Sequence, residues 1–161
     1  MITIEDYPER HYLGLRREIT MSTFGLVGDR IAEMIGWLLE RGVNPAGAPF
    51  FRYDLIDMPA DRLVVQVGVP VAAPVEPEGE FYADSLPAGR YAVVLHHGHP
   101  DRLVSATADL LAWADEQGLK WDMTNEADGE HWTARTEHYL TDPRVTPDLN
   151  EWDTELQFKL G

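Results

Sequence analysis

The sequence predicts an α+β domain in which one strand–helix–strand–strand unit occurs twice. The first observation is the order of the expected elements, which is the same in residues 1–71 and in residues 90–160. The second is the end of each expected helix, where Trp37-Leu-Leu-Glu-Arg-Gly and Trp113-Ala-Asp-Glu-Gln-Gly place tryptophan, glutamate and glycine at the same spacing. The third is the length of 161 residues, which suits one domain made of two similar halves.

The first unit is expected to contain three strands, with its helix between the first two. Alternating residues predict a strand over 11–20, and apolar residues at helical spacing predict a helix over 23–41. Gly42 directly follows and is suited to ending that helix. A turn rich in proline and glycine leads to strands predicted over 50–57 and 62–71, the second of them rich in β-branched residues.

The second unit is expected to repeat this order. A strand is predicted over 90–96, and a helix follows whose apolar face includes residues between Leu103 and Ala114. Asp101 is its expected N-cap, since a short polar side chain can accept a hydrogen bond from the first turn. The last two strands are predicted over 132–141 and 152–160, after a polar loop.

Residues 72–89 separate the two units, and their prolines and glycines predict a connector without a packed element. Either unit alone would leave one face of its sheet uncovered. Joined together, the units would form one antiparallel sheet with both helices on one face. We expect the other face to curve around a ligand in a cleft at the junction, where pockets often lie. The chain is therefore treated as a single domain over residues 1–161.

Charge and composition exclude several classes of function. The chain has 13 Lys+Arg and 28 Asp+Glu, a net charge of −15, which disfavours direct contact with nucleic acid or an anionic membrane. The same charge would attract cationic ligands or a basic protein partner, although it could equally serve solubility alone. The absence of cysteine excludes disulfides and thiolate metal sites. No signal-peptide pattern and no membrane-length apolar run is present, so we expect a cytoplasmic protein.

Three motifs in the second half resemble the pattern of GyrI-like, effector-binding domains. Leu86-Pro-Ala-Gly-Arg-Tyr-Ala-Val-Val-Leu-His-His-Gly98 is similar to the family's Leu-Pro-Gly-Gly, Tyr-Ala-Val and His-x-Gly series. The helix ending Leu-Leu-Ala-Trp113 follows. Thr136-Glu-His-Tyr-Leu-Thr-Asp-Pro143 then matches the family's Glu-x-Tyr and Asp-Pro. The sequence departs from the pattern at His99-Pro100, where the family usually has Pro-Tyr.

The resemblance implies a domain that binds hydrophobic, often cationic, compounds between its two halves without a cofactor. Some members of the family hydrolyse reactive cyclopropane-bearing natural products, and others act as gyrase-inhibitor-type protein partners. Members that regulate transcription join this domain to a DNA-binding segment, and we expect none here because the first repeat begins near residue 1. Binding and sequestration or sensing of a xenobiotic is thus the first hypothesis, hydrolysis the second and protein interaction the third.

Glu137 is the main candidate for chemistry. Alternation places Arg135, Glu137 and Tyr139 on one face of their strand, opposite Thr136 and His138. A carboxylate in an aromatic cleft would select cations, and its desolvation would raise its pKa and suit it to acid–base catalysis. Periodicity alone favours an exposed glutamate, and Arg135 could simply neutralise its charge. The resemblance instead assigns Glu137 and Tyr139 to the ligand site.

Several aromatic residues are candidates for the walls of this cleft. Phe51 and Tyr53 occupy positions equivalent to Glu137 and Tyr139 and could hold a flat ligand or simply pack in the core. Phe81 and Tyr82 could form a lid over the cleft or anchor the connector. The remaining tryptophans of the second half are further candidates, Trp132 among them, whereas Trp37 and Trp113 are expected in the core.

The histidines at 96, 97 and 99 raise the question of a metal site. Zinc commonly uses histidine, but neighbouring residues of a strand point to opposite faces, so this cluster is not expected to bind metal. His96 falls on the His-x-Gly turn of the resemblance and is placed with the ligand site instead. For the hydrolase hypothesis, Glu80 and Glu155 are the candidates for a second carboxylate.

Overall fold

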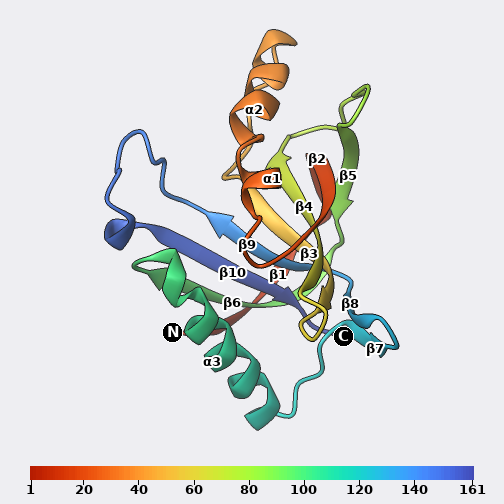
Figure 1. Cartoon of the computed structure of the whole chain (residues 1–161), viewed down its shortest axis with the longest axis vertical. Helices are drawn as coiled ribbons and strands as arrows, with labels where there is room; N and C mark the ends of the chain where they lie inside the picture. Colours follow the sequence, from red (N-terminus) through yellow and green to blue (C-terminus); the bar gives the residue numbers. More distant parts are fainter.

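One antiparallel sheet organises the whole chain. The computed structural model describes residues 1–161, and its ten strands form a single curled sheet that carries the helices (Figure 1). The elements of the first half are β1 (Thr3–Tyr7), β2 (Arg10–Ile19), α1 (Gly25–Gly28), α2 (Ile31–Glu40), β3 (Phe50–Asp57) and β4 (Arg62–Pro70). Those of the second half are β5 (Tyr82–Leu86), β6 (Gly89–His97), the 3-10 turn η1 (Pro100–Arg102), α3 (Leu103–Glu116), β7 (Met123–Glu126), β8 (Gly129–Trp132), β9 (Arg135–Tyr139), η2 (Leu149–Glu151) and β10 (Asp153–Lys159). None of the helices is long and apolar enough to cross a membrane.

The order of strands is symmetrical about the contact between β3 and β9. The centre of the sheet runs β6-β10-β9-β3-β4-β2, so each half contributes its strands in the mirrored order. At the outer edges, β1 pairs with β6 and β5 pairs with β2. The strand that leads into each half therefore extends the sheet of the other half, and the two halves share one continuous hydrogen-bonded structure.

Both long helices end in the same way, as the repeated tryptophan–glutamate–glycine pattern predicted. Gly42 and Gly118 have φ of +71° and +69°, a left-handed conformation that glycine adopts without steric cost. The amide after each glycine donates back into the last helical turn, from Val43 to Leu38 and from Leu119 to Ala114, each at 2.9 Å. These are the bonds of a Schellman motif, which satisfies carbonyl groups that the helix leaves free.

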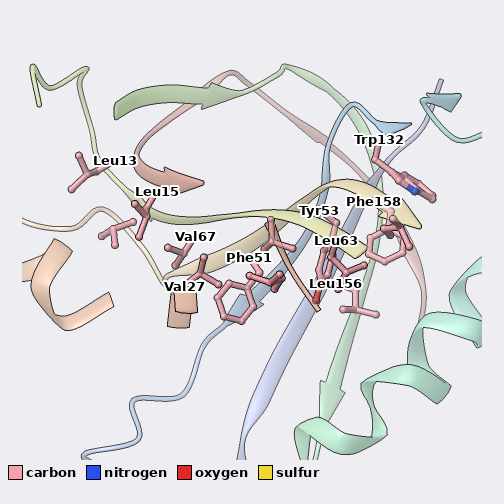
Figure 2. Packing of buried hydrophobic residues seen from close by; sticks show 14 of the residues in the cluster. Leu13, Leu15, Val27, Phe51, Tyr53, Leu63, Val67, Trp132, Leu156 and Phe158 are labelled. Carbon is pink, nitrogen blue, oxygen red and sulfur yellow. The ribbon is translucent and has the colours of Figure 1, made fainter. Parts of the chain in front are cut away.

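The face of the sheet that carries the helices forms the main core. Met34 and Leu38 of α2 and Leu110 of α3 belong to the same buried cluster as the strand residues beneath them. Figure 2 shows several of those strand residues, among them Leu15, Val67 and Phe51. Strand pairing lines up one row of side chains on this face across both halves: Leu15, Val67, Phe51, Glu137, Leu156 and Val94. Glu137 is the single charged residue of this row and lies at its centre.

The predicted helix over 23–41 is interrupted in the structure. A four-residue helix, α1, is followed by a separate α2 that begins at Ile31. The break follows the glycines at 25 and 28, which lower helix propensity in this stretch. The predicted N-cap at Asp101 is also wrong: Asp101 lies inside η1, and the side chain of His99 accepts the hydrogen bond from its amide at 3.1 Å.

Three other predictions about the strands require correction. The connector 72–89 contains a strand, β5, because Tyr82–Leu86 finds the free edge of β2. The polar loop before the predicted strand 132–141 contains the hairpin of β7 and β8. The predicted strand itself shortens to β9, because Trp132 ends β8 and pairing resumes only at Arg135; β8 and β9 pair with different parts of β3 on either side of a bulge near Tyr53. In each case long-range pairing with a neighbouring strand, rather than local periodicity, decides the structure.

Candidate functional site

A cavity of about 460 Å³ lies over the junction of β3 and β9. The segment around α1 forms one wall, the β3–β4 hairpin forms another, and η1 with the first turn of α3 closes the opposite side. Ten of its fifteen lining residues are hydrophobic. The lining residues are Met21, Phe24, Phe51, Tyr53, Ile56, Met58, Leu63, Pro100, Asp101, Leu103, Val104, Thr107, Arg135, Glu137 and Tyr139.

This cavity opens on the face that carries the helices, between them. The sequence had suggested the opposite face, and that expectation is wrong because the opposite face is filled by its own side chains. Tyr12, Phe50 and Tyr91 form a second buried cluster there, each no more than 1% exposed. The apolar cavity lies instead where α1 and α3 stand apart above the junction of the two halves.

Glu137 forms part of the cavity wall and is largely removed from solvent. It is 9% exposed, and its Oε2 accepts a hydrogen bond of 2.9 Å from the Tyr139 hydroxyl. No arginine, lysine or histidine forms an ion pair with it. Desolvation raises the pKa of Glu137, against the hydrogen bonds from Tyr139 and Tyr53 and the attraction of Arg135, which lower it. A buried carboxylate without an ion-pair partner is costly to the fold and therefore points to a binding role.

Aromatic rings surround this carboxylate. Phe51 lies directly opposite Glu137 on β3, and its ring meets that of Tyr139 edge-on at 5.2 Å. Phe24 lies in the turn before α1, and the centre of its ring is 5.7 Å from that of Phe51 and 6.2 Å from that of Tyr53. Such faces attract flat apolar groups and cations, so the carboxylate and the rings favour the same class of ligand.

The structure brings four of the predicted site residues together and places four elsewhere. Phe51, Tyr53, Glu137 and Tyr139 line the cavity. The other four are Phe81, Tyr82, Trp132 and His96, and none of them lines it.

Each of these four side chains has another environment. The ring of Phe81 is buried against Trp37 at 6.3 Å, which corresponds to the anchoring alternative rather than to a lid. The Tyr82 hydroxyl donates to Gln66 on the opposite face of the sheet. Trp132 packs on Phe158, as Figure 2 shows, and His96 contacts the backbone oxygen of His99 at 3.2 Å. We therefore propose no ligand contact for these four side chains.

Several lining residues have no signal in the strand pattern. Phe24 was expected inside a continuous helix, and only the nearby glycines indicated that its segment could bend back over the sheet. Pro100 lines the wall where the resembling family usually carries an aromatic residue nearby. Met58 and Val104, 58% and 70% exposed, give the mouth of the cavity an apolar rim.

The histidines near residue 97 do not converge on a common point. His97 contacts Asp153 at 2.8 Å, while the ring of His99 caps η1. No group of three or more His, Cys, Asp or Glu side chains in the chain is arranged to hold a metal ion.

Comparison with known proteins assigns the chain to a family. The model of the GyrI-like small molecule binding domain matches residues 1–160. The chain belongs to this family. No curated protein matches the chain.

Several solved structures share the fold at low sequence identity. The C-terminal domain of EcmrR has a TM-score of 0.76 and 20% identity over 100% of this chain and 97% of that one. In an EcmrR–DNA complex, the TM-score is 0.78 at 19% identity, and the match covers 99% of this chain but only 57% of the EcmrR chain. SAV2435 bound to tetraphenylphosphonium gives a TM-score of 0.58 at 9% identity, over 100% and 94% of the two chains. A hydrolase from Listeria innocua has a TM-score of 0.66 at 13% identity, and the match covers 99% of this chain and 91% of that one.

Proposed function

We propose that this GyrI-like domain binds hydrophobic cations in the cavity over the β3–β9 junction, as a sensing or sequestering module for xenobiotics. The observation that carries the proposal is the position of Glu137, a buried carboxylate without an ion-pair partner in the centre of an otherwise apolar row. A cation bound beside it would supply the missing charge, and the rings of Phe51, Tyr53 and Tyr139 would stack on its apolar part. That SAV2435, a protein of the same fold, is bound to tetraphenylphosphonium supports this class of ligand.

Isothermal titration calorimetry with tetraphenylphosphonium tests this function. A unit charge pair at about 4 Å is worth about 4 kcal/mol at an effective dielectric of 20, and desolvation of the carboxylate offsets part of it. We therefore expect Glu137→Gln to weaken binding by about 30-fold, equivalent to about 2 kcal/mol. Triphenylphosphine oxide, a neutral compound of similar shape, should bind weakly to both proteins.

The matched control is Glu116→Gln, which neutralises an exposed carboxylate on α3 away from the cavity. It should bind tetraphenylphosphonium like the wild type. Absence of binding to the wild type, or equal affinity for Glu137→Gln, would contradict the proposal.

Hydrolysis of a strained electrophile is the second candidate, and the raised pKa of Glu137 favours it. A carboxyl that remains protonated closer to neutral pH could donate a proton to a leaving group in the cavity. The two carboxylates proposed as its partner lie elsewhere: Glu80 pairs with Arg17 and Arg30, and Glu155 accepts a hydrogen bond from Gln157 on the opposite face. The test is to incubate wild type and Glu137→Gln with a cyclopropane-bearing alkylating compound. Equal product from both would remove Glu137 as the catalyst.

A further inference from the structure

A second charged side chain shares the wall of the cavity with Glu137. Arg135 lies two residues earlier on β9, so its side chain leaves the same face of the sheet and lines the same cavity. The third charged lining residue, Asp101, is at the mouth, where its side chain is 90% exposed. The interior of the cavity thus contains one carboxylate and one guanidinium.

Three aromatic rings hold the guanidinium in place. Its Cζ lies 4.6 Å from the ring centre of Phe158, 4.8 Å from that of Trp132 and 5.8 Å from that of Tyr53. Figure 2 shows these three rings at one end of the buried cluster, with Leu156 near Phe158. Contacts with three aromatic rings limit the motion of the group, which reduces the entropy that a ligand contact would cost.

The hydrogen-bonding capacity of Arg135 is left unused by the protein. Its Nε is buried without a partner, and neither terminal nitrogen donates a hydrogen bond. It forms no ion pair: Glu137 and, more weakly, Glu130 attract it without contact, and Glu130 accepts its own hydrogen bond from the Trp132 indole at 2.9 Å. Desolvation lowers the pKa of Arg135, although an arginine still remains charged at neutral pH.

These features set opposite requirements for a ligand. A simple cation beside Glu137 meets a like charge in Arg135, whereas an anionic group beside Arg135 gains a bidentate, charge-assisted contact. A compound that carries both charges on an aromatic body satisfies the two side chains at once. A neutral or purely cationic compound leaves the buried guanidinium without an acceptor, which is costly.

We propose that the preferred ligands are amphoteric aromatic compounds, with a cationic nitrogen beside Glu137 and a carboxylate held by Arg135. This inference rests on the proposed binding function and names the substrate class of the same cavity. Arg135 then sets the difference in affinity between cationic ligands with and without a carboxylate, since Glu137 contacts the cationic group that both kinds share.

A pair of dyes that differ in one group tests this preference. Rhodamine 110 carries a free carboxylate, and rhodamine 123 is its methyl ester, so the two share the cationic ring system. Fluorescence anisotropy at pH 7.5 gives both dissociation constants. We expect the wild type to bind the acid at least tenfold more tightly than the ester.

Substitutions at the two charged positions separate their roles. Arg135→Met keeps length and packing but removes the charge, and should reduce the preference for the acid to less than threefold. Arg135→Lys keeps the charge and should retain a preference for the acid. Glu137→Gln should weaken both dyes by a similar factor and leave their ratio unchanged. Circular dichroism melts confirm that each variant is folded. The ratio of the two dissociation constants of the wild type tests the preference even if a variant fails to fold.

The outcomes distinguish this inference from the function on which it rests. The amphoteric preference is overturned if the wild type binds both dyes equally or favours the ester. It is also overturned if folded Arg135→Met keeps the wild-type ratio of the two dissociation constants. In either case the proposed function stands as long as tetraphenylphosphonium still binds through Glu137. If neither dye nor tetraphenylphosphonium binds, the proposed function and the preference are both overturned.

Discussion

Replacing Glu137 by glutamine is expected to make the protein more stable while it weakens ligand binding. The carboxylate is 9% exposed, and its desolvation raises its pKa, so the folded state disfavours the charge. The amide has nearly the same shape, and its oxygen can still accept the hydrogen bond from Tyr139. The charge is removed, and one acceptor oxygen is replaced by an NH2 donor.

The size of the effect follows from what the substitution changes. No cavity is created, and desolvation outweighs the hydrogen bonds from Tyr139 and Tyr53 that favour the charge, so relief of the desolvation penalty dominates. Single substitutions that remove such a penalty commonly contribute about 0.5–2 kcal/mol, and the retained Tyr139 bond places this one at about 1–2 kcal/mol at pH 7.5. For a domain of this size that corresponds to a rise in Tm of roughly 2–8 °C.

The dependence on pH gives the sharper test of Glu137. The pKa of Glu137 is higher in the folded state than in the unfolded state, where it is about 4.3. The stability of the wild type relative to Glu137→Gln is therefore greatest below the unfolded pKa. This relative stability is lost as pH rises through the folded pKa. Urea unfolding from pH 4 to 8 should therefore show wild type and Glu137→Gln converging at acid pH and separating above it. An equal or lower stability of the variant at pH 7.5, or a difference that does not vary with pH, would refute the desolvation argument.

Three further predictions concern packing and surface charge. Gly68→Ala should lower the free energy of unfolding by about 1–3 kcal/mol, because a Cβ at this position would lie 2.4 Å from Cζ of the buried Phe50 ring. A urea unfolding midpoint equal to that of the wild type would contradict this prediction. Phe81→Ala should lower stability by about 3 kcal/mol yet leave the affinity for tetraphenylphosphonium unchanged, since Phe81 anchors the connector outside the cavity. The pKa of His131 should lie above its ordinary value because of the hydrogen bond with Asp128, and NMR titration of Asp128→Asn should show it lowered. An unchanged titration would show that this contact does not form in solution.

The repeated helix ending was predictable from the sequence because its causes are local. A glycine after the last helical turn permits the left-handed conformation wherever the helix lies, so Gly42 and Gly118 could be assigned without a partner in view. Alternation along β9 is similarly local. It placed Arg135, Glu137 and Tyr139 on one face, and the three side chains line one cavity.

Elements that depend on a distant partner were missed. Tyr82–Leu86 has no strong alternation and becomes a strand through its pairing with β2, and the polar β7–β8 hairpin is attached to the sheet through β3. The contacts that Arg135 makes with Trp132 and Phe158 were also outside the reach of periodicity, because β10 lies beside β9 only in the folded sheet.

The sequence by itself determined the doubled order of strands and helices, the helix ends, and the presence of a carboxylate among aromatic residues. Each of these follows from spacing within a few residues of the chain. Only the tertiary structure decided that the cavity lies between the helices and that an unpaired guanidinium faces it beside Glu137. The physical reason is that space and desolvation are properties of the packed assembly: the curled sheet fills its opposite face with Tyr12, Phe50 and Tyr91 and leaves room where α1 and α3 stand apart.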